Sequence, residues 1–415
     1  MSLSKNPPPC VPATFLVNGR TYRPPPRPVV VVCLDGCGDE YLDAALARGR
    51  MPRLARMAAD GYRGLVRAAL PSFTNVNNCA IITGTPPRDT GIAGNYILDP
   101  TTGDEVMTNS VKYLRNDTVL AAAARVGRKV AAVTAKDKLR ELLAKDLRGV
   151  SFSAENADHG IADVDALVGP APPIYSAAAS VYVLRAGAAL VGLGLADFCY
   201  LTTTDYVQHK YGPTEPEALD FYAAIDGELG RLLDLGAVVG VTADHGMNAK
   251  CDAAGNPRVL YLETRLKERF GDRVRVLCPI TDPYVVHHGA LGSAVTVYLP
   301  PAVSRPEAAR WVLDLEGVAE VYERPTAARK LELPSDRIGD LFVLAGRDWV
   351  IGRTPAHHDL TALGGRPLRS HGGRYEEMVP LVLSEPLSDE YAARAAGDPR
   401  NFDVFDFTCN GASVR

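Results

Sequence analysis

The chain has 415 residues, of which 47% are hydrophobic and 23% charged, and its formal net charge is -4. These values are ordinary for a soluble globular protein, and the length suggests two or three structural units. A negative net charge provides no broad cationic field for phosphates, so we expect no nucleic-acid partner. No stretch reaches the roughly 18 apolar residues of a membrane span, and we expect no membrane partner.

The first residues and the cysteines favour a reducing cytoplasm. Residues 1–28 are rich in proline and contain no uninterrupted apolar segment, so we expect no secretory signal and a path across the surface. The eight cysteines are scattered without a CxxC pair, and Cys33 and Cys79 lie in apolar runs that are typical of buried thiols.

The strongest predicted elements alternate between strands and helices. The run VVVVC after Pro28 predicts a strand buried on both faces, and a helix should begin at Pro52 and stop at Gly61. VAAVTAKDKLRELL, DFCYLTTTDYVQH and GAVVGVTADHGM each predict a further strand followed by a loop or helix. This alternation indicates an α/β fold with a doubly wound, mostly parallel sheet.

The pattern changes between about residues 255 and 365. SAVTVYLP, PEAARWVLDLEG, VAEVYERP and GDLFVLAG predict strand, helix, strand and strand, with no metal-type motif among them. We therefore predict an inserted α+β cap over 255–365. The core domain would consist of residues 1–254 and 366–415, resuming with RSHGGRYEEMVPLVL.

Carboxylates and imidazoles gather in four short motifs, LDGCG, TDYVQH, ADHG and SHGG. They supply Asp35, Asp205, His209, Asp244, His245 and His371. The three aspartates follow apolar strands, and the carboxyl ends of parallel strands meet at one sheet edge. Zinc is held by imidazole nitrogen and carboxylate oxygen, so three aspartates and three histidines are enough for two zinc sites.

The spacing within two motifs predicts local geometry. Asp205 and His209 are four residues apart, so one helical turn would place them on the same face. Asp244 and His245 are adjacent and would point to opposite faces of a strand, so both reach a metal only if the chain turns at Gly246.

The segment PSFTNVNN offers Thr74 as a nucleophile. A threonine hydroxyl is a poor nucleophile at neutral pH, but coordination to a divalent ion lowers its pKa. A helix beginning after Thr74 would also direct backbone N–H groups at an incoming anion. A purely structural hydroxyl is the alternative, and Asn77 and Asn78 are interpreted as caps of the helix.

The order of these motifs resembles the alkaline phosphatase superfamily, in the branch of the nucleotide pyrophosphatase/phosphodiesterases. P-S-F-T-N, G-N-Y and T-A-K-D-K-L-R in this order are similar to the phosphonoacetate hydrolases. The resemblance implies an alkaline phosphatase-like core and two zinc ions per chain. It implies one ion among Asp35, Thr74, Asp244 and His245, and the other among Asp205, His209 and His371.

Three further residues narrow the range of expected substrates. Asn95 in AGNYIL resembles the asparagine that helps to hold a phosphoryl oxygen, and Lys136 and Lys138 follow a predicted strand. Phosphonoacetate carries a carboxylate, and cations beside it would stabilise the charge that develops as the P–C bond breaks. We therefore predict hydrolysis of phosphonoacetate to acetate and phosphate through a phospho-threonine.

Several alternatives stay open. A phosphodiesterase or nucleotide pyrophosphatase would not need Lys136 and Lys138, which would then be a solvated helix start. A phosphomutase relative would use the cap for sugar-phosphate contacts, and a non-catalytic phosphonate-binding protein would show no turnover. The oligomeric state is also open, with a homodimer as one option. The other histidines are interpreted as surface or core residues, with substrate contact open for the last four: His159, His287, His288, His357 and His358.

Overall fold

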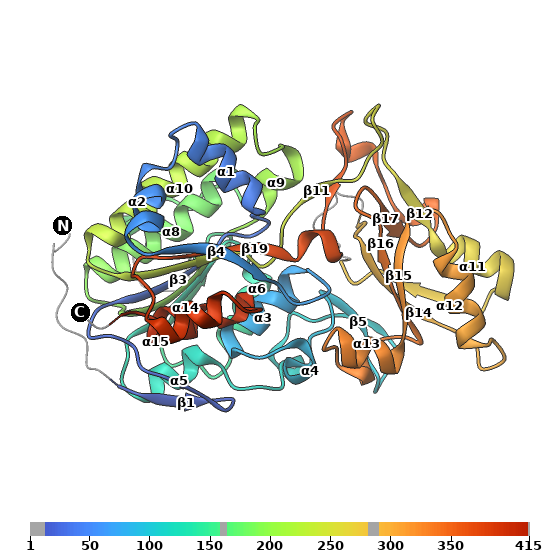
Figure 1. Ribbon diagram of the computed structural model, residues 1–415, viewed down its shortest axis with the longest axis horizontal. Helices are drawn as coiled ribbons and strands as arrows, with labels where there is room; N and C mark the ends of the chain where they lie inside the picture. The colour runs from blue at the N-terminus through green and yellow to red at the C-terminus, as the bar shows by residue number, and fades with distance from the viewer. Residues whose placement is uncertain (1–12, 158–163, 281–289, 414–415) are drawn as a thin grey trace.

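A seven-stranded sheet forms the centre of the computed structural model, which describes residues 13–157, 164–280 and 290–413 (Figure 1). The five strands from β10 to β8 are parallel, and β19 runs antiparallel to both of its neighbours. This confirms the predicted α/β fold with a mostly parallel sheet. The strand order is β4 (Tyr62–Arg67), β19 (Met378–Leu383), β10 (Val238–Thr242), β3 (Val29–Cys33), β9 (Phe198–Thr202), β7 (Val130–Thr134) and β8 (Val150–Ser153).

Helices cover both faces of this sheet, as a doubly wound fold requires. α8 (Ala177–Gly192) and α10 (Pro216–Asp234) lie on one face, and α5 (Val119–Arg125) and α15 (Val404–Asn410) lie on the other (Figure 1). Because both faces are covered, β3, β7, β9 and β10 are buried along their whole length. Continuous apolar runs without alternation are the expected result.

One predicted helix has the predicted limits, and another that was predicted without limits is present. α2 spans Pro52–Asp60 and ends at Gly61, and α6 spans Asp137–Leu143 after β7. The short hairpin of β1 (Phe15–Val17) and β2 (Arg20–Tyr22) was not predicted, because three-residue strands between prolines carry little periodicity. Smaller elements are α1 (Asp39–Ala47), α4 (Pro87–Thr90), β5 (Tyr96–Leu98), β6 (Glu105–Met107), α7 (Val164–Val168) and α14 (Asp389–Ala395).

A second, four-stranded antiparallel sheet stands beside the first (Figure 1). It has an apolar cluster of its own, which includes Val295, Val297, Leu341 and Val343. The predicted strand, helix, strand and strand are present as β14, α12, β15 and β16, but a helix that was not predicted, α13, lies between β15 and β16. The boundaries at 254 and 365 stay a prediction. Its elements are α11 (Leu262–Phe270), β13 (Arg275–Leu277), β14 (Ala294–Tyr298), α12 (Arg305–Leu313), β15 (Val318–Glu323), α13 (Arg324–Lys330) and β16 (Leu341–Ala345).

Two short ladders join the chain segments that leave and re-enter the main sheet. β12 (Val259–Tyr261) pairs with β17 (Val350–Gly352), and β11 (Asn248–Ala249) pairs with β18 (Arg369–Ser370). The second ladder brings the segment after Asp244 beside the segment before His371. Over the part of the chain that the structure describes, no helix combines the length and apolarity needed to cross a membrane.

Candidate active site

Six buried ionisable side chains meet at the carboxyl edge of the parallel strands, in two groups of three. Within each group the potential ligand atoms lie within 4.8 Å of one another. Each side chain belongs to a residue that is at most 6% exposed. The first group is Asp205, His209 and His371, and the second is Asp35, Asp244 and His245.

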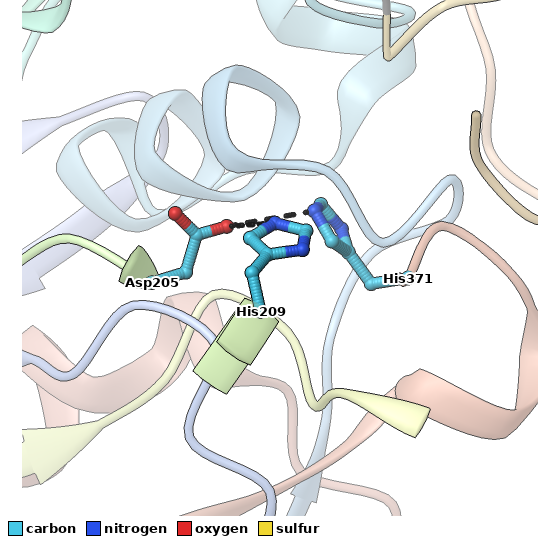
Figure 2. Close-up of side chains that lie close together, drawn as sticks. All are labelled: Asp205, His209 and His371. Carbon is cyan, nitrogen blue, oxygen red and sulfur yellow. Dashed lines mark ion pairs between the residues drawn. The ribbon is translucent and has the colours of Figure 1, made fainter. Parts of the chain in front are cut away.

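The first group is built by one turn of helix and one returning loop. α9 (Tyr206–Lys210) begins directly after Asp205, so the four-residue spacing brings Nε2 of His209 to 2.9 Å from Oδ2 of Asp205. Nε2 of His371 lies 3.7 Å from the same oxygen. Figure 2 shows the three side chains converging from these two segments. The predicted helical geometry of Asp205 and His209 is therefore observed.

The second group follows two neighbouring strands. Nε2 of His245 lies 3.3 Å from Oδ1 of Asp35 and 3.7 Å from Oδ2 of Asp244. Asp244 and His245 both reach this group because β10 ends at Thr242. The chain thus leaves the strand before the turn that was expected at Gly246.

The three histidines are oriented by backbone carbonyl groups. Each ring places Nδ1 against a carbonyl oxygen, so Nδ1–H donates and Nε2 is directed to the acidic groups. The pairs are His209 with Arg369 (2.8 Å), His371 with Ser72 (2.8 Å) and His245 with Gly246 (2.9 Å). Because Nδ1–H is engaged by the carbonyl, Nε2 is the ring atom that each histidine can direct at a metal ion.

The second group concentrates negative charge. Burial and the charge of Asp35 hold the pKa of Asp244 well above its usual range. Burial would lower the pKa of His245, but Asp244 and Asp35 outweigh it and raise this pKa to about 9. Both carboxylate oxygens of Asp35 are buried, and neither accepts a hydrogen bond from a described residue.

In the first group, the pKa values of Asp205 and His371 are both lowered. Burial alone would raise the pKa of Asp205, but Lys136 and His209 hold it well below its usual range. The pKa of His371 is well below its usual range, because the side chain is buried beside His245 and His209. A neutral His371 and two Asp35 oxygens that accept no hydrogen bond from the residues described fit two divalent cations, since buried polar groups are normally hydrogen-bonded or bind a metal. Imidazole and carboxylate donors suit zinc.

Thr74 lies at the start of a helix that points at the second group. α3 spans Thr74–Thr83, and Oγ1 of Thr74 lies 3.5 Å from Nε2 of His245. The loop after His371 packs closely against this segment at Gly372, where only glycine fits. Its φ is +115°, and a Cβ there would lie 2.2 Å from the ring of Phe73.

A cavity of about 50 Å³ opens beside Thr74 and Asp35. Nζ of Lys136 lies 3.1 Å from Oδ1 of Asp205 and 4.0 Å from Oδ2 of Asp35. The structure therefore brings the predicted substrate-binding residues to one place. The cavity is lined by Asp35, Thr74, Asn75, Asn95, Met107, Asn109, Thr134, Lys136, Lys138, Leu139 and Thr203.

The remaining histidines are elsewhere or not described. Neither His357 nor His358 lines this cavity. His358 is 7% exposed and its Nε2 accepts a hydrogen bond from the backbone N of Arg353 at 2.8 Å. This contact agrees with the interpretation of His358 as a structural residue. His159, His287 and His288 lie outside the described residues.

The interpretation of Asn77 and Asn78 as helix caps is wrong. Nδ2 of Asn78 donates to Oδ2 of Asp244 at 3.2 Å, and the hydroxyl of Tyr200 donates to Oδ1 of Asn78 at 2.7 Å. Asn77 instead bonds the backbone of Ala69, through both its amide oxygen and its amide nitrogen. Asparagine is a poor helix former, so two buried asparagines in one helix were a signal for such tertiary partners.

The fold and this site define a class. Residues 29–141 and 195–374 match the family of type I phosphodiesterases and nucleotide pyrophosphatases, and the chain belongs to this family.

Within that class, the chain is similar to phosphonoacetate hydrolase from Sinorhizobium meliloti 1021. Crystal structures of that enzyme with phosphonoacetate and with phosphonoformate are 47% identical to this chain, with a TM-score of 0.91. The alignment covers 97% of this chain and 99% of that chain. The predicted resemblance to this enzyme group is confirmed, and with it the prediction that the chain is an enzyme.

Two other relatives are more limited matches. Phosphonoacetate hydrolase from Penicillium oxalicum is 63% identical over 27 residues, which are 6% of this chain and 38% of that protein. Murine ectonucleotide pyrophosphatase/phosphodiesterase 5 is 16% identical over 94% of this chain and 96% of its own, with a TM-score of 0.62. The murine protein therefore shares the fold.

Proposed function

We propose that this chain is a zinc-dependent phosphonoacetate hydrolase that releases acetate and phosphate. The observation that carries the proposal is the single cavity in which Thr74, Asn95, Lys136 and Lys138 stand beside two groups of buried ligand-type side chains. The crystallised relative at 47% identity, which was solved with phosphonoacetate, supports the same substrate.

The donor set assigns the metal-holding residues. Asp35, Thr74, Asp244 and His245 would hold one zinc ion, and Asp205, His209 and His371 would hold the other. When bound, two zinc ions lower the pKa of the attacking hydroxyl and polarise the phosphoryl group.

The chain itself supplies the nucleophile and the phosphoryl contacts. Thr74 attacks phosphorus from the first position of α3, where the helix dipole favours an anion. The oxygen of the Asn95 side chain accepts from the backbone N of Asn75 at 2.9 Å, which fixes the carboxamide at the cavity wall. Its amino group is then available to donate to a phosphoryl oxygen.

Lys136 and Lys138 stabilise the leaving group. As the P–C bond breaks, its electron pair passes into the carboxylate as an enediolate, which is then protonated to acetate. Lys136 and Lys138 stabilise this developing charge. Lys136 has a second task, because it also neutralises Asp205. Water finally hydrolyses the phospho-threonine and returns Thr74 to its starting state.

The family match supports a second candidate, a phosphodiesterase or nucleotide pyrophosphatase. The two lysines that line the cavity and the crystallised relative at 47% identity favour phosphonoacetate, because a phosphodiester has no carboxylate for the lysines to bind.

Turnover of four substrates separates the candidates. Phosphate release is measured for three of them, and release of the aryl alcohol is measured for the aryl phosphodiester, because its hydrolysis leaves a phosphomonoester instead of phosphate. The panel contains phosphonoacetate, phosphonoacetaldehyde, a phosphomonoester and an aryl phosphodiester. The proposal predicts that zinc-loaded protein has its highest kcat/KM on phosphonoacetate, with one acetate formed per phosphate. A clear preference for the aryl phosphodiester would replace the proposal with the second candidate.

A further inference from the structure

A buried ion pair lies beside the two ligand groups, outside the cavity that holds Thr74. Nζ of Lys250 lies 2.8 Å from Oε1 of Glu376, and both side chains are 0% exposed. Lys250 directly follows β11, and Glu376 lies shortly after β18. The proposed reaction gives neither residue a role.

Glu376 is bonded to both of the segments that carry ligand histidines. Its backbone oxygen accepts from the N of Gly246, the residue after His245, at 2.8 Å. Its Oε2 accepts from the N of Gly373, two residues after His371, at 3.0 Å. One residue thus connects the His245 segment of the second group with the His371 segment of the first.

Further hydrogen bonds hold the two charged side chains in one position. Oε1 of Glu376 also accepts from Nδ2 of Asn248 at 2.7 Å, and Nζ of Lys250 also donates to the carbonyl of Arg347 at 2.7 Å. The backbone N of Lys250 donates to the carbonyl of Leu368 at 2.8 Å, which extends the β11–β18 ladder. A buried network in which Nζ of Lys250 and both carboxylate oxygens of Glu376 have hydrogen-bond partners favours a single geometry.

The two histidines that this network connects are in direct contact. The rings of His245 and His371 stack with their centroids 3.5 Å apart and an angle of 5° between the planes. Because these histidines belong to different ligand groups, the distance between their segments sets the distance between the groups. A shift of either segment would change both groups together.

A buried ion pair is weak evidence for stability, because desolvation offsets most of its Coulomb energy. Its position between the two ligand segments points to another role. We propose that Lys250 and Glu376 are positioning residues that fix His245 against His371 and thereby set the spacing of the two candidate zinc sites. This inference rests on the proposed function for its metal and its reaction.

The test is the double variant Lys250→Met/Glu376→Gln, which removes both charges and keeps an acceptor for Gly373. Its matched control is Arg128→Met/Asp197→Asn. That pair is also largely buried, with Nε 2.8 Å from Oδ1, but it lies at the opposite, amino end of the strands. The measurements are the melting temperature, the zinc retained against a competing chelator, and kcat and KM for phosphonoacetate.

The proposal predicts that the double variant loses zinc about 10- to 100-fold more readily and that its kcat falls by a similar factor, with little change in KM. The control should lower the melting temperature without these losses. Equal zinc retention and equal kcat in the two variants would overturn the inference. If the wild type retains zinc but has no activity on phosphonoacetate, the proposed function fails, while zinc retention still decides the inference.

A milder variant covers the case in which the double variant does not fold. Asn248→Ala removes one donor to Glu376 and leaves the ion pair in place. We expect a smaller loss of zinc retention and kcat in the same direction, at an almost unchanged melting temperature. Wild-type zinc retention in Asn248→Ala, together with misfolding of the double variant, would show that the pair serves the fold alone.

Discussion

Two buried carboxylates, one at the edge of the main sheet and one beside the second sheet, differ sharply in their surroundings. Asp35 and Glu263 are each 1% exposed. Glu263 accepts from Nζ of Lys267 at 2.8 Å, from Nε of Arg353 at 3.0 Å and from the N of Val276 at 3.0 Å. Neither oxygen of Asp35 accepts a hydrogen bond within the described part of the chain.

The difference separates a carboxylate that holds the fold from one that is available to a ligand. Burial would raise the pKa of Glu263, but the bonds from Lys267, Val276 and Arg353 lower it. At the sheet edge, burial and the charge of Asp35 instead raise the pKa of the neighbouring Asp244. Asp35 lies near His245 and Lys136 but its carboxylate receives no hydrogen bond from a described residue, so part of the free energy lost by burying its charge is regained when a cation binds. Whether a buried carboxylate is already hydrogen-bonded therefore distinguishes the two roles.

The largest expected effect is that of replacing Thr74, the proposed nucleophile beside the group that contains Asp35. Thr74→Ala should lower turnover of phosphonoacetate by more than about a thousandfold, because the attacking oxygen is gone. Folding and zinc content should be largely unchanged, and Thr74→Ser should keep part of the activity. Single-turnover kinetics with measured zinc content checks this. Turnover near the wild-type rate in Thr74→Ala would make a water molecule the nucleophile.

The comparison itself is tested by neutralising each carboxylate. Asp35→Asn should lose zinc and lower activity by more than about a hundredfold, while the metal-free fold becomes no less stable because repulsion with Asp244 is relieved. Glu263→Gln should cost about 1–3 kcal/mol of unfolding free energy and keep zinc and activity. Denaturant unfolding and metal analysis on both variants are the measurements. Loss of zinc in Glu263→Gln, or loss of stability with retained zinc in Asp35→Asn, would contradict the distinction between the two carboxylates.

Lys136 and Lys138 are expected to determine the preference for phosphonoacetate over a phosphodiester. Lys138→Ala should reduce kcat/KM for phosphonoacetate about ten- to a hundredfold and leave an aryl phosphodiester almost unaffected, because only phosphonoacetate carries a carboxylate. Lys136→Ala should affect both substrates, since Lys136 also contacts Asp205. Steady-state kinetics at confirmed zinc content measures the loss of kcat/KM on each of the two substrates. Equal losses on both substrates in Lys138→Ala would assign this lysine to the phosphoryl site or to the fold.

The smallest expected effect is a pH dependence at Glu263. Because folding lowers the pKa of this carboxyl from its reference value of 4.5, its stabilisation is complete above that value and is lost as pH falls through the folded pKa. The difference in unfolding free energy between wild type and Glu263→Gln should therefore shrink in acid. Chemical denaturation of the two proteins between pH 7 and about pH 3 would show it, and a constant difference would contradict the assignment.

The sequence predicted what depends on local pattern. Continuous apolar runs indicated β3 and β10, and the residues that follow them, Asp35 and Asp244, were placed correctly at one sheet edge. The four-residue spacing of Asp205 and His209 also predicted their contact. In each case the residue pattern within one short segment determines the position of the side chains.

The contacts that tie the site together join distant segments and carry no local signal. Lys250 and Glu376 are 126 residues apart, and Asn78 and Asp244 are 166 apart. An isolated lysine or asparagine in a sequence is more often solvated or a cap than a buried partner. The fold decides which of these residues meet, so they become visible only in three dimensions.

We expect that the two groups of buried side chains at the sheet edge are two zinc sites. Anomalous diffraction at the zinc edge from crystals of zinc-loaded protein tests it most directly. The account predicts two peaks, one among Asp205, His209 and His371 and the other beside Asp35, Asp244 and His245. A single peak, or peaks outside both groups, would contradict it.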